Sequence, residues 1–189
     1  MAQLAQPIET ERLILRPFEP SDLDDLASLF GDESVNRYLY SEPRSRDETN
    51  SALEKRLGRG SHPEEDTILR VAIALPTTNR LIGDFMLHWN EDVHRQGEIG
   101  GSLHPDVHGR GYASEVYGPL LELAFTRYDL HRVCGRCDGR NAASVRSLQK
   151  AGLRQEGHFV ENEFVKGEWT DEIVLAILAS EWRATHHPS

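Results

Sequence analysis

The sequence predicts one mixed α+β domain, in which helices flank a mostly antiparallel sheet of about seven strands. Apolar residues recur at helical spacing in residues 23–30, alternate with a period of two between residues 67 and 104, and return to helical spacing after residue 112. The 189 residues are enough to bury one core, and no linker, repeat or low-complexity tract divides them. This order of elements is typical of an α+β fold.

The first third of the chain is expected to form one strand and two helices. In residues 11–18, Leu13 and Leu15 occupy alternate positions, as in a strand with one buried face. Pro20-Ser21-Asp22 is a helix start signal, and a second helix is expected over residues 47–57. The polar stretch 60–66 is predicted to be a surface loop.

The strands and helices after residue 66 are predicted from the spacing of apolar residues, with a period of two in strands and 3.6 in helices, and from turn residues between them. The turn Pro76-Thr-Thr-Asn79 separates two apolar strands, Asn141 is a helix cap, and Lys166-Gly167 joins a final hairpin. The predicted strands are 67–75, 81–89, 97–104, 132–138, 153–161 and 169–178, and the predicted helices are 112–128 and 142–151. Within the first of these helices, Pro119 is expected to produce a kink.

Composition excludes several classes of protein. A net charge of -10 argues against binding to nucleic acid or to an anionic membrane. The longest apolar run, residues 173–179, is too short to span a bilayer, and the N-terminus lacks the features of a secretory signal. Cys134 and Cys137 are too few for a disulfide framework and point to opposite faces of a strand, so we expect a cytoplasmic protein with no metal site.

The segment 108–113, with the sequence His-Gly-Arg-Gly-Tyr-Ala, is the most informative motif. It lies between a predicted strand and a predicted helix, in the only quarter of the chain with more basic than acidic residues. Two glycines allow a tight turn, and the free N–H groups of a helix start attract an anion such as a pyrophosphate. The alternative is a plain strand-to-helix turn. The spacing fits neither a nucleotide-hydrolase loop nor a dinucleotide-binding loop.

At these residues the chain resembles the GCN5-related N-acetyltransferases (GNAT), and most closely the branch that acetylates ribosomal-protein N-termini and similar amines. The motifs that match are Ile8-Glu-Thr-Glu-Arg-Leu-Ile-Leu-Arg-Pro17, Asp32 to Tyr38, Glu98-Ile-Gly100, His108 to Ala113, and Asn141-Ala-Ala-Ser144 through Leu153. The resemblance implies a single domain over residues 8–183, with short tails at 1–7 and 184–189. It also implies a sheet splayed between the fourth and fifth strands.

The resemblance implies transfer of an acetyl group from acetyl-coenzyme A, as co-substrate, to an amine. The pyrophosphate is expected on the backbone amides that begin the helix, the pantetheine arm beside the end of the fourth strand, and an asparagine on the other side of that arm. The residues so assigned to the cofactor are Leu103, His108, Gly109, Arg110, Gly111, Tyr112, Ala113 and Asn141.

Two residues are candidates for proton transfer. A protonated amine must lose a proton before it attacks, and Glu98 is the candidate base because burial among apolar and glycine residues raises a carboxyl pKa. Many relatives have a tyrosine acid where this chain has Leu148, so Ser144 is the candidate proton donor to the leaving thiolate. The alternatives are an outward strand carboxylate for Glu98 and a hydroxyl of the first helical turn for Ser144.

The sequence leaves other questions open. A non-catalytic acyl-coenzyme A binder and an unrelated nucleotide enzyme are the alternative functions. The amine acceptor is either a peptide N-terminus or a small molecule, and the protein is either a monomer or a homodimer. His186 and His187 are expected in a loose C-terminal tail.

Overall fold

The computed structural model describes residues 4–58, 67–90 and 93–186. The strands are β1 (Ile8–Glu9), β2 (Ile14–Arg16), β3 (Ile68–Ala74), β4 (Leu81–Trp89), β5 (Gln96–Leu103), β6 (Arg132–Asp138), β7 (Arg154–Val165) and β8 (Glu168–Leu178). The helices are α1 (Leu23–Gly31), α2 (Glu33–Asn36), α3 (Arg46–Arg56), α4 (Tyr112–Glu122), α5 (Ala142–Lys150) and α6 (Ala179–His186). The predicted α+β class is therefore confirmed.

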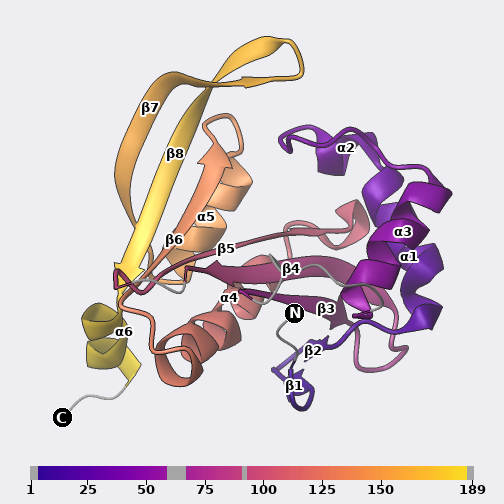
Figure 1. The fold of residues 1–189 in the computed structure, drawn as a ribbon, viewed down its shortest axis with the longest axis horizontal. Coiled ribbons are helices and arrows are strands. Elements are labelled where there is room, and N and C mark those ends of the chain that lie inside the picture. The colour runs from indigo at the N-terminus through magenta and orange to yellow at the C-terminus, as the bar shows by residue number, and fades with distance from the viewer. Residues whose placement is uncertain (1–3, 59–66, 91–92, 187–189) are drawn as a thin grey trace.

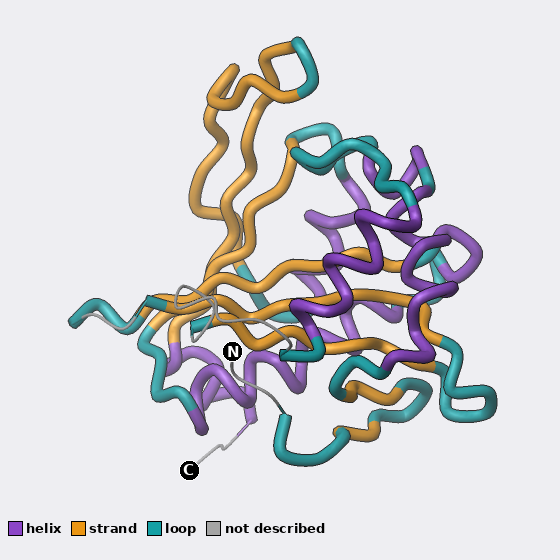
Figure 2. The backbone as a smooth tube through the Cα atoms, turned by 45° about the vertical axis from the view of Figure 1, so that its right-hand side comes forward, coloured by secondary structure: helices purple, strands orange, loops and turns teal. Residues whose placement is uncertain are grey.

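The strands form one sheet in the order β1-β2-β3-β4-β5-β6-β8-β7. Every neighbouring pair is antiparallel except β5 and β6, which are parallel because α4 connects them across one face. Helices α1 and α3 pack on the opposite face, and β7 and β8 rise away from the rest of the sheet as a long hairpin (Figures 1 and 2).

Apolar side chains on the two sides of the sheet form two cores. The larger one lies against α4, α5 and α6, and includes Phe85, Phe125 and Trp182. The smaller one lies against α1 and α3, and includes Leu26 and Leu53. Because strand side chains alternate between faces, the residues of β4 and β5 that do not enter the larger core point toward the α1–α3 side.

The predicted splay between the fourth and fifth strands is confirmed as a separation of β5 from β6. These strands pair only from Gln96 to Glu98, opposite Arg132 to Cys134. Beyond Cys134, β6 continues to pair with β8 on its other side. Residues 99–103 therefore form a strand edge that faces an opening rather than a neighbouring β6 strand.

The structure corrects several predicted boundaries. The sheet has eight strands, because the short strand β1 precedes the predicted first strand 11–18, and a turn between Thr10 and Leu13 joins it to β2. Strand β2 covers only residues 14–16 of that prediction. The helix predicted over 112–128 ends at Glu122 and continues as a wider π-helical turn over Leu123–Arg127. The predicted loop 60–66 lies outside the described residues.

Two short helices were missed by the sequence patterns. Four-residue α2 begins where the Asp32 carboxylate accepts hydrogen bonds from the amides of Ser34 and Val35, and it is too short to show a period. Helix α6 follows β8 without a turn residue, and it includes His186, which stacks on Trp182 at a ring distance of 4.8 Å. The expectation of a loose tail was therefore wrong for residues 184–186, while His187 lies outside the described residues.

Candidate active site

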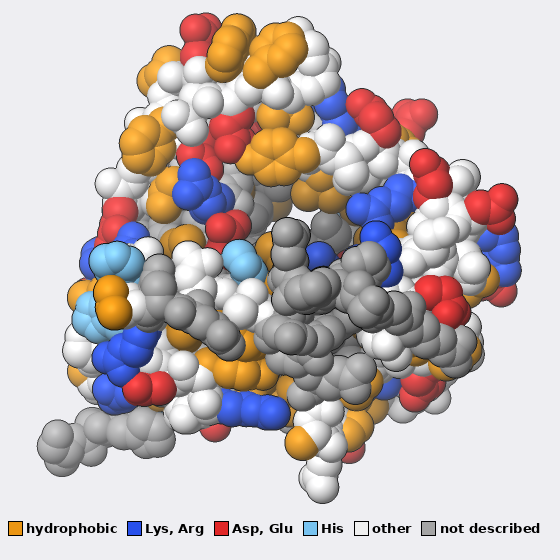
Figure 3. Space-filling model, in the orientation of Figure 1, with side chains coloured by type: hydrophobic (Ala, Val, Ile, Leu, Met, Phe, Trp, Pro, Cys, Tyr) orange, Lys and Arg blue, Asp and Glu red, His pale blue; other side chains and the backbone are white. Residues whose placement is uncertain are grey.

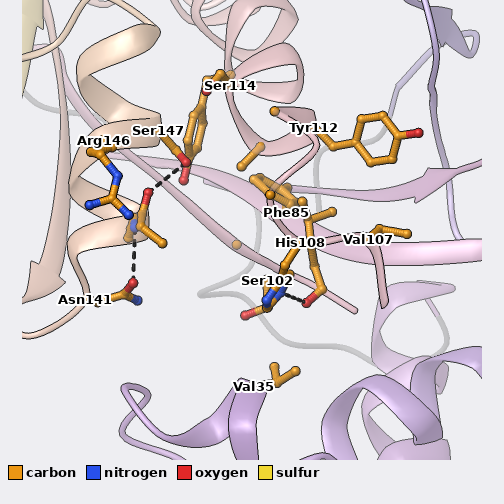
Figure 4. Close-up of a pocket in the computed structure, with 18 of the residues that line it drawn as sticks. Val35, Phe85, Ser102, Val107, His108, Tyr112, Ser114, Asn141, Arg146 and Ser147 are labelled. Atoms are coloured by element: carbon orange, nitrogen blue, oxygen red, sulfur yellow. Dashed lines mark hydrogen bonds between the residues drawn. The ribbon is translucent and has the colours of Figure 1, made fainter. Parts of the chain in front are cut away.

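A cavity of about 470 Å³ lies where β5 and β6 separate. Its walls are the end of β5, the segment 107–114 that leads into α4, the first turns of α5 and the segment 34–39 around α2 (Figure 4). Eight of the ten residues predicted for the site line this cavity: Leu103, His108, Gly109, Gly111, Tyr112, Ala113, Asn141 and Ser144. The two others, Arg110 and Glu98, lie elsewhere.

The segment before α4 turns sharply because two glycines adopt backbone angles that other residues rarely take. Gly109 has φ 75° and Gly111 has φ 79°, both in the left-handed region. The first helical hydrogen bond runs from the amide of Glu115 to the carbonyl of Gly111. The amides of Tyr112, Ala113 and Ser114 have no acceptor within the helix and lie at the cavity, where the helix dipole favours an anion.

The turn between β1 and β2 braces this loop from behind. The carboxylate of Glu115 accepts hydrogen bonds from the Thr10 hydroxyl at 2.6 Å, the Arg12 amide at 2.8 Å and Arg12 Nε at 2.8 Å. Arg12 also donates to the carbonyl of Arg110 at 2.9 Å and lies 4.7 Å from the centre of the Tyr112 ring. Burial raises the pKa of Glu115, but these hydrogen bonds outweigh burial and the pKa lies below its ordinary value.

His108 and Arg110 differ in how they face the cavity. His108 Nε2 donates to the carbonyl of Leu103 at 2.8 Å, which ties the loop to the last residue of β5 and places the ring proton on that nitrogen. The Arg110 side chain instead donates to the carbonyl of Asp106 at 3.2 Å and does not line the cavity. The positive charge expected from Arg110 therefore points away from the cavity in this structure.

Two basic residues that sequence reasoning missed line the cavity from α5. Arg146 and Lys150 are four residues apart, so they lie on one face of the helix, and both line the cavity together with Ser147. Figure 4 shows Arg146 and Ser147 on this helix. Their spacing was visible in the sequence, but nothing in the sequence showed that this face of α5 meets the loop after β5.

Asn141 and Ser144 occupy the first turn of α5. The side-chain oxygen of Asn141 accepts a hydrogen bond from the Ser144 amide at 3.1 Å, so Asn141 is the expected helix cap. Its amide nitrogen remains as a donor at the cavity. Burial raises the pKa of the Cys137 thiol, and a hydrogen bond from the Ser144 hydroxyl partly offsets this increase. Ser144 therefore lies between the cavity and the half-buried Cys137 thiol.

Glu98 lies on the α1–α3 face of the sheet rather than in the wall of the cavity. It pairs with His88 of β4 and with Cys134 of β6, at the point where the β5–β6 ladder ends. Its carboxyl is half-buried, and burial raises its pKa, with partial opposition from Arg136 and His88. Farther along the same face, Gly100 leaves open space beside the strand edge.

A hollow lies between the β7–β8 hairpin on one side and the helical segments on the other (Figure 3). Glu98 interacts electrostatically with Arg136, Glu172 and Glu163, which belong to β6 and to this hairpin. Glu172 of β8 is almost completely buried, and it accepts hydrogen bonds from Arg136 at 2.6 and 3.0 Å and from Asn162 at 3.0 Å. The Tyr40 hydroxyl donates to Glu163 of the hairpin. This contact crosses between the hairpin and the segment after α2.

A lysine makes a second link across the hollow. Lys166, at the hairpin turn, donates to the carbonyl of Asn36 at 2.7 Å, and it lies 3.7 Å from the Glu42 carboxylate. Because the same hairpin also binds Tyr40, two contacts hold it beside the segment 36–42. These contacts make the hollow a defined space between two parts of the chain that are more than 100 residues apart.

Three further predicted features have clear positions in the structure. Leu148 is buried and packs against Gly135, where a Cβ would lie 2.8 Å from its methyl groups. Cys134 and Cys137 are free thiols on β6.

Within residues 4–58, 67–90 and 93–186, no group of three or more potential ligand side chains is placed to hold a metal ion. No helix in those ranges is long and apolar enough to cross a bilayer.

Comparison with known proteins identifies relatives along most of the chain. A family model described as the acetyltransferase (GNAT) domain matches residues 12–154. The uncharacterized N-acetyltransferase YnaD of Bacillus subtilis (strain 168) is 30% identical over 175 residues, which cover 93% of this chain and 98% of that protein.

Solved structures of acetyltransferases are also similar to this chain. A GNAT-family acetyltransferase from Bacillus anthracis has a TM-score of 0.81 and 28% sequence identity, over 93% of this chain and 99% of that chain. A spermidine N-acetyltransferase from Vibrio cholerae, solved in complex with CoA and spermine, has a TM-score of 0.77 and 27% identity, over 92% of this chain and 99% of that chain.

Proposed function

Because the chain belongs to the GNAT family of acetyl-coenzyme A-dependent N-acetyltransferases, we propose that it acetylates a primary amine by direct attack, with the cofactor on one side of the sheet and the amine on the other. The observation that supports this most is the separation of β5 from β6. It leaves an opening with free helix amides toward α4 and a half-buried carboxyl, Glu98, on the opposite face.

The residues at the cavity fit a long anionic cofactor. The amides of Gly109 and of the first turn of α4 would hold its pyrophosphate, and Arg146 and Lys150 supply positive charge from α5. A Cβ at Gly109 would meet no atom within 4 Å, so the space beside this loop residue is open. The strand edge near Leu103 and the Asn141 amide nitrogen would contact the pantetheine arm. Acetyl-coenzyme A supplies the activated acetyl group.

Glu98 is proposed as the base that removes a proton from the acceptor ammonium. Burial raises its pKa. A higher carboxyl pKa lies closer to neutral pH, where a general base is most effective. Arg136 faces the same region and is held by Glu172, so it limits how far the pKa of Glu98 rises. Glu98 faces the hollow from which an amine would approach.

Ser144 is proposed to deliver a proton to the leaving thiolate, directly or through a water molecule. The position used by many relatives for a tyrosine acid is Leu148, which is buried in the core and has no proton to give. Ser144 lines the cavity near Asn141 and contacts the Cys137 thiol. A Ser144→Ala variant is expected to lower kcat and to leave the affinity for coenzyme A unchanged.

The acceptor is proposed to be either a peptide N-terminus, as in the ribosomal-protein branch of the family, or a small amine. A screen of coenzyme A release tests this with N-terminal peptides, spermidine, spermine and aminoglycosides, followed by mass spectrometry of the product. One acceptor class is expected to give acetylated product. Binding of acetyl-coenzyme A without turnover on any amine would instead support the non-catalytic binder. Gel filtration with light scattering distinguishes a monomer from a homodimer.

A further inference from the structure

A second cavity, of about 380 Å³, lies between α3 and β3, away from the cofactor cavity. Four cationic side chains line it: Arg44, Lys55, Arg56 and Arg70. Glu48 is the acidic residue in its wall, and Ser51 and Ala52 complete it. This concentration of positive charge is unusual in a chain whose net charge is -10.

Among the described residues that line this cavity, Glu48 is the acidic side chain beside four cationic ones. Asp84 lies behind the cavity and forms ion pairs with two arginines. Its carboxylate is 2.6 Å from Arg56 and 4.0 Å from Arg70. Glu48 is held by the amide and hydroxyl of Ser45 at the start of α3. In the part of the chain that the structure describes, Arg44 and Lys55 form no ion pair. In the described lining of the cavity, cationic side chains therefore outnumber acidic ones.

Aromatic rings hold two of the cations in place. The Phe30 ring lies 4.7 Å from the Arg44 guanidinium and 5.2 Å from that of Arg56, and Phe18 lies 5.5 Å from Arg56. Arg56 also donates to the carbonyl of Ala52 at 3.0 Å. Side chains that are already fixed lose little conformational entropy when a ligand binds, so these groups are prepared for an anion.

The cavity opens on the same face of the sheet as the proposed base. Arg70 pairs with Met86, which pairs with Gly100, and Glu98 is two residues before Gly100 on β5. Strands are about 4.8 Å apart, so Arg70 lies roughly 10 Å across the sheet from the strand that contains Glu98. An amine at Glu98 and an anionic group at the second cavity are therefore within the reach of one molecule of modest size.

We propose that this cavity is an oxyanion-binding site, which takes a phosphate or carboxylate group through Arg44, Lys55 and Arg56. The group has two potential sources: an acidic substituent of the acceptor, or a free anion that binds beside the acceptor. Both sources use the same contacts, since guanidinium and ammonium groups donate charge-assisted hydrogen bonds to either oxyanion.

The binding test uses inorganic phosphate with the protein saturated by coenzyme A, so that the α4 loop is filled. Phosphate at constant ionic strength is expected to raise the melting temperature above that of a matched chloride buffer. Lys55→Gln, which changes an exposed side chain, is expected to weaken phosphate binding about tenfold, the effect of losing one charge-assisted hydrogen bond. Arg44→Gln/Lys55→Gln is expected to abolish the shift.

The matched control is Arg46→Gln, which removes the same charge from α3 outside the cavity. It is expected to bind phosphate like the unaltered protein. Equal phosphate shifts in Lys55→Gln, Arg46→Gln and the unaltered chain would overturn the proposal, as would a chloride shift equal to that of phosphate. These readouts need no turnover, so they are independent of whether the proposed acetyl transfer is correct.

A second measurement identifies the source of the anion. Two acceptor peptides that differ only by aspartate or asparagine at the third position are compared. If the acceptor supplies the group, kcat/KM is about tenfold higher for the aspartate peptide, and Lys55→Gln removes this preference. If a free anion binds, the two peptides react equally and phosphate changes their kinetics.

Discussion

The two sides of the sheet are built in different ways. On the α4–α5 side, the cavity is formed mainly by two continuous segments, residues 103–114 and 141–150, and its anion-binding groups are largely backbone amides. On the α1–α3 side, the hollow depends on side-chain contacts between distant residues, such as Arg136 with Glu172 and Lys166 with Asn36. The cavity on the α4–α5 side therefore depends on particular backbone angles, whereas the hollow on the α1–α3 side depends on particular side chains.

This difference predicts where substitutions act. Changes on the α4–α5 side are expected to alter affinity for the cofactor, because the amides contact a part of it that does not react. Changes on the α1–α3 side are expected to alter the rate or the choice of acceptor. Four substitutions test this division by separating effects on cofactor affinity from effects on the rate or on the KM for the acceptor.

The largest effect is expected for Glu98→Gln. A general base contributes typically about 100-fold or more to the rate, so kcat is expected to fall by at least that factor while binding of acetyl-coenzyme A stays unchanged. In the unaltered enzyme, activity is expected to rise with pH through the raised pKa of Glu98, because only the carboxylate accepts a proton. Full activity of the variant across the pH range would remove Glu98 from this role.

Stability provides a further check on Glu98. A carboxyl whose pKa is raised in the folded state favours the protonated form, and that contribution to stability is lost as pH rises through the folded-state pKa. At neutral pH, Glu98→Gln is therefore expected to keep or raise the melting temperature. A large fall in melting temperature would instead indicate a structural role.

Gly111→Ala is expected to weaken the cofactor side. An alanine in the left-handed region costs about 1–2 kcal/mol, which corresponds to roughly tenfold weaker binding of acetyl-coenzyme A if the loop relaxes. The matched control is Gly118→Ala in the same helix, where a Cβ meets no atom within 4 Å. That control is expected to raise helix stability by about 0.5–1 kcal/mol. Similar binding constants for both variants, measured by calorimetry, would contradict the role of the loop.

A smaller effect is expected for Arg12→Gln, which removes the brace behind the loop. Arg12 touches Glu115 and the Arg110 carbonyl, so its loss is expected to raise the KM for acetyl-coenzyme A about fivefold, or 1 kcal/mol, with kcat unchanged. Because the pKa of Glu115 is lowered in the folded state, the brace is fully present above its unfolded-state pKa and is lost as pH falls through its lower folded-state pKa. A change in kcat alone would show that Arg12 acts elsewhere.

The smallest effect is expected for Tyr40→Phe, which removes one hydroxyl that links the hairpin to the segment after α2. The exposed position of Tyr40 limits the contribution of this hydrogen bond to a few tenths of a kcal/mol, so the KM for the acceptor is expected to rise about twofold. The KM for acetyl-coenzyme A is expected to stay constant. A change in cofactor affinity would show that the two sides of the sheet are coupled.

Local sequence signals predicted the order of the major strands and helices. The bounds of β4 and β6 agree with the sequence prediction. The patterns missed β1 and α2, which have only two and four residues and therefore show no period. They also extended the α4 prediction past Glu122, since a π-helical turn keeps its apolar residues near helical spacing.

In the candidate site, too, some features could be predicted from the local sequence and others could not. The resemblance to acetyltransferases assigned Leu103, Asn141 and the loop after β5 to one site, and these residues line one cavity. They lie at the ends of elements that the sequence predicts. It placed the Arg110 charge there as well, whereas the side chain turns toward Asp106. Arg146 and Lys150 were missed because helix spacing alone does not show which face meets a ligand.

The sequence by itself determined the backbone features of this protein: the glycines that turn the loop before α4, the cap at Asn141 and the alternation of the central strands. Each depends on residues that are neighbours in the chain. The tertiary structure alone decided that Arg12 meets Glu115, that Glu98 faces Arg136 and Glu172, and that Phe30 aligns two arginines around a second cavity. The order of the strands in the sheet brings these residues together. Local conformational preferences cannot predict that order, because it depends on contacts between distant parts of the chain.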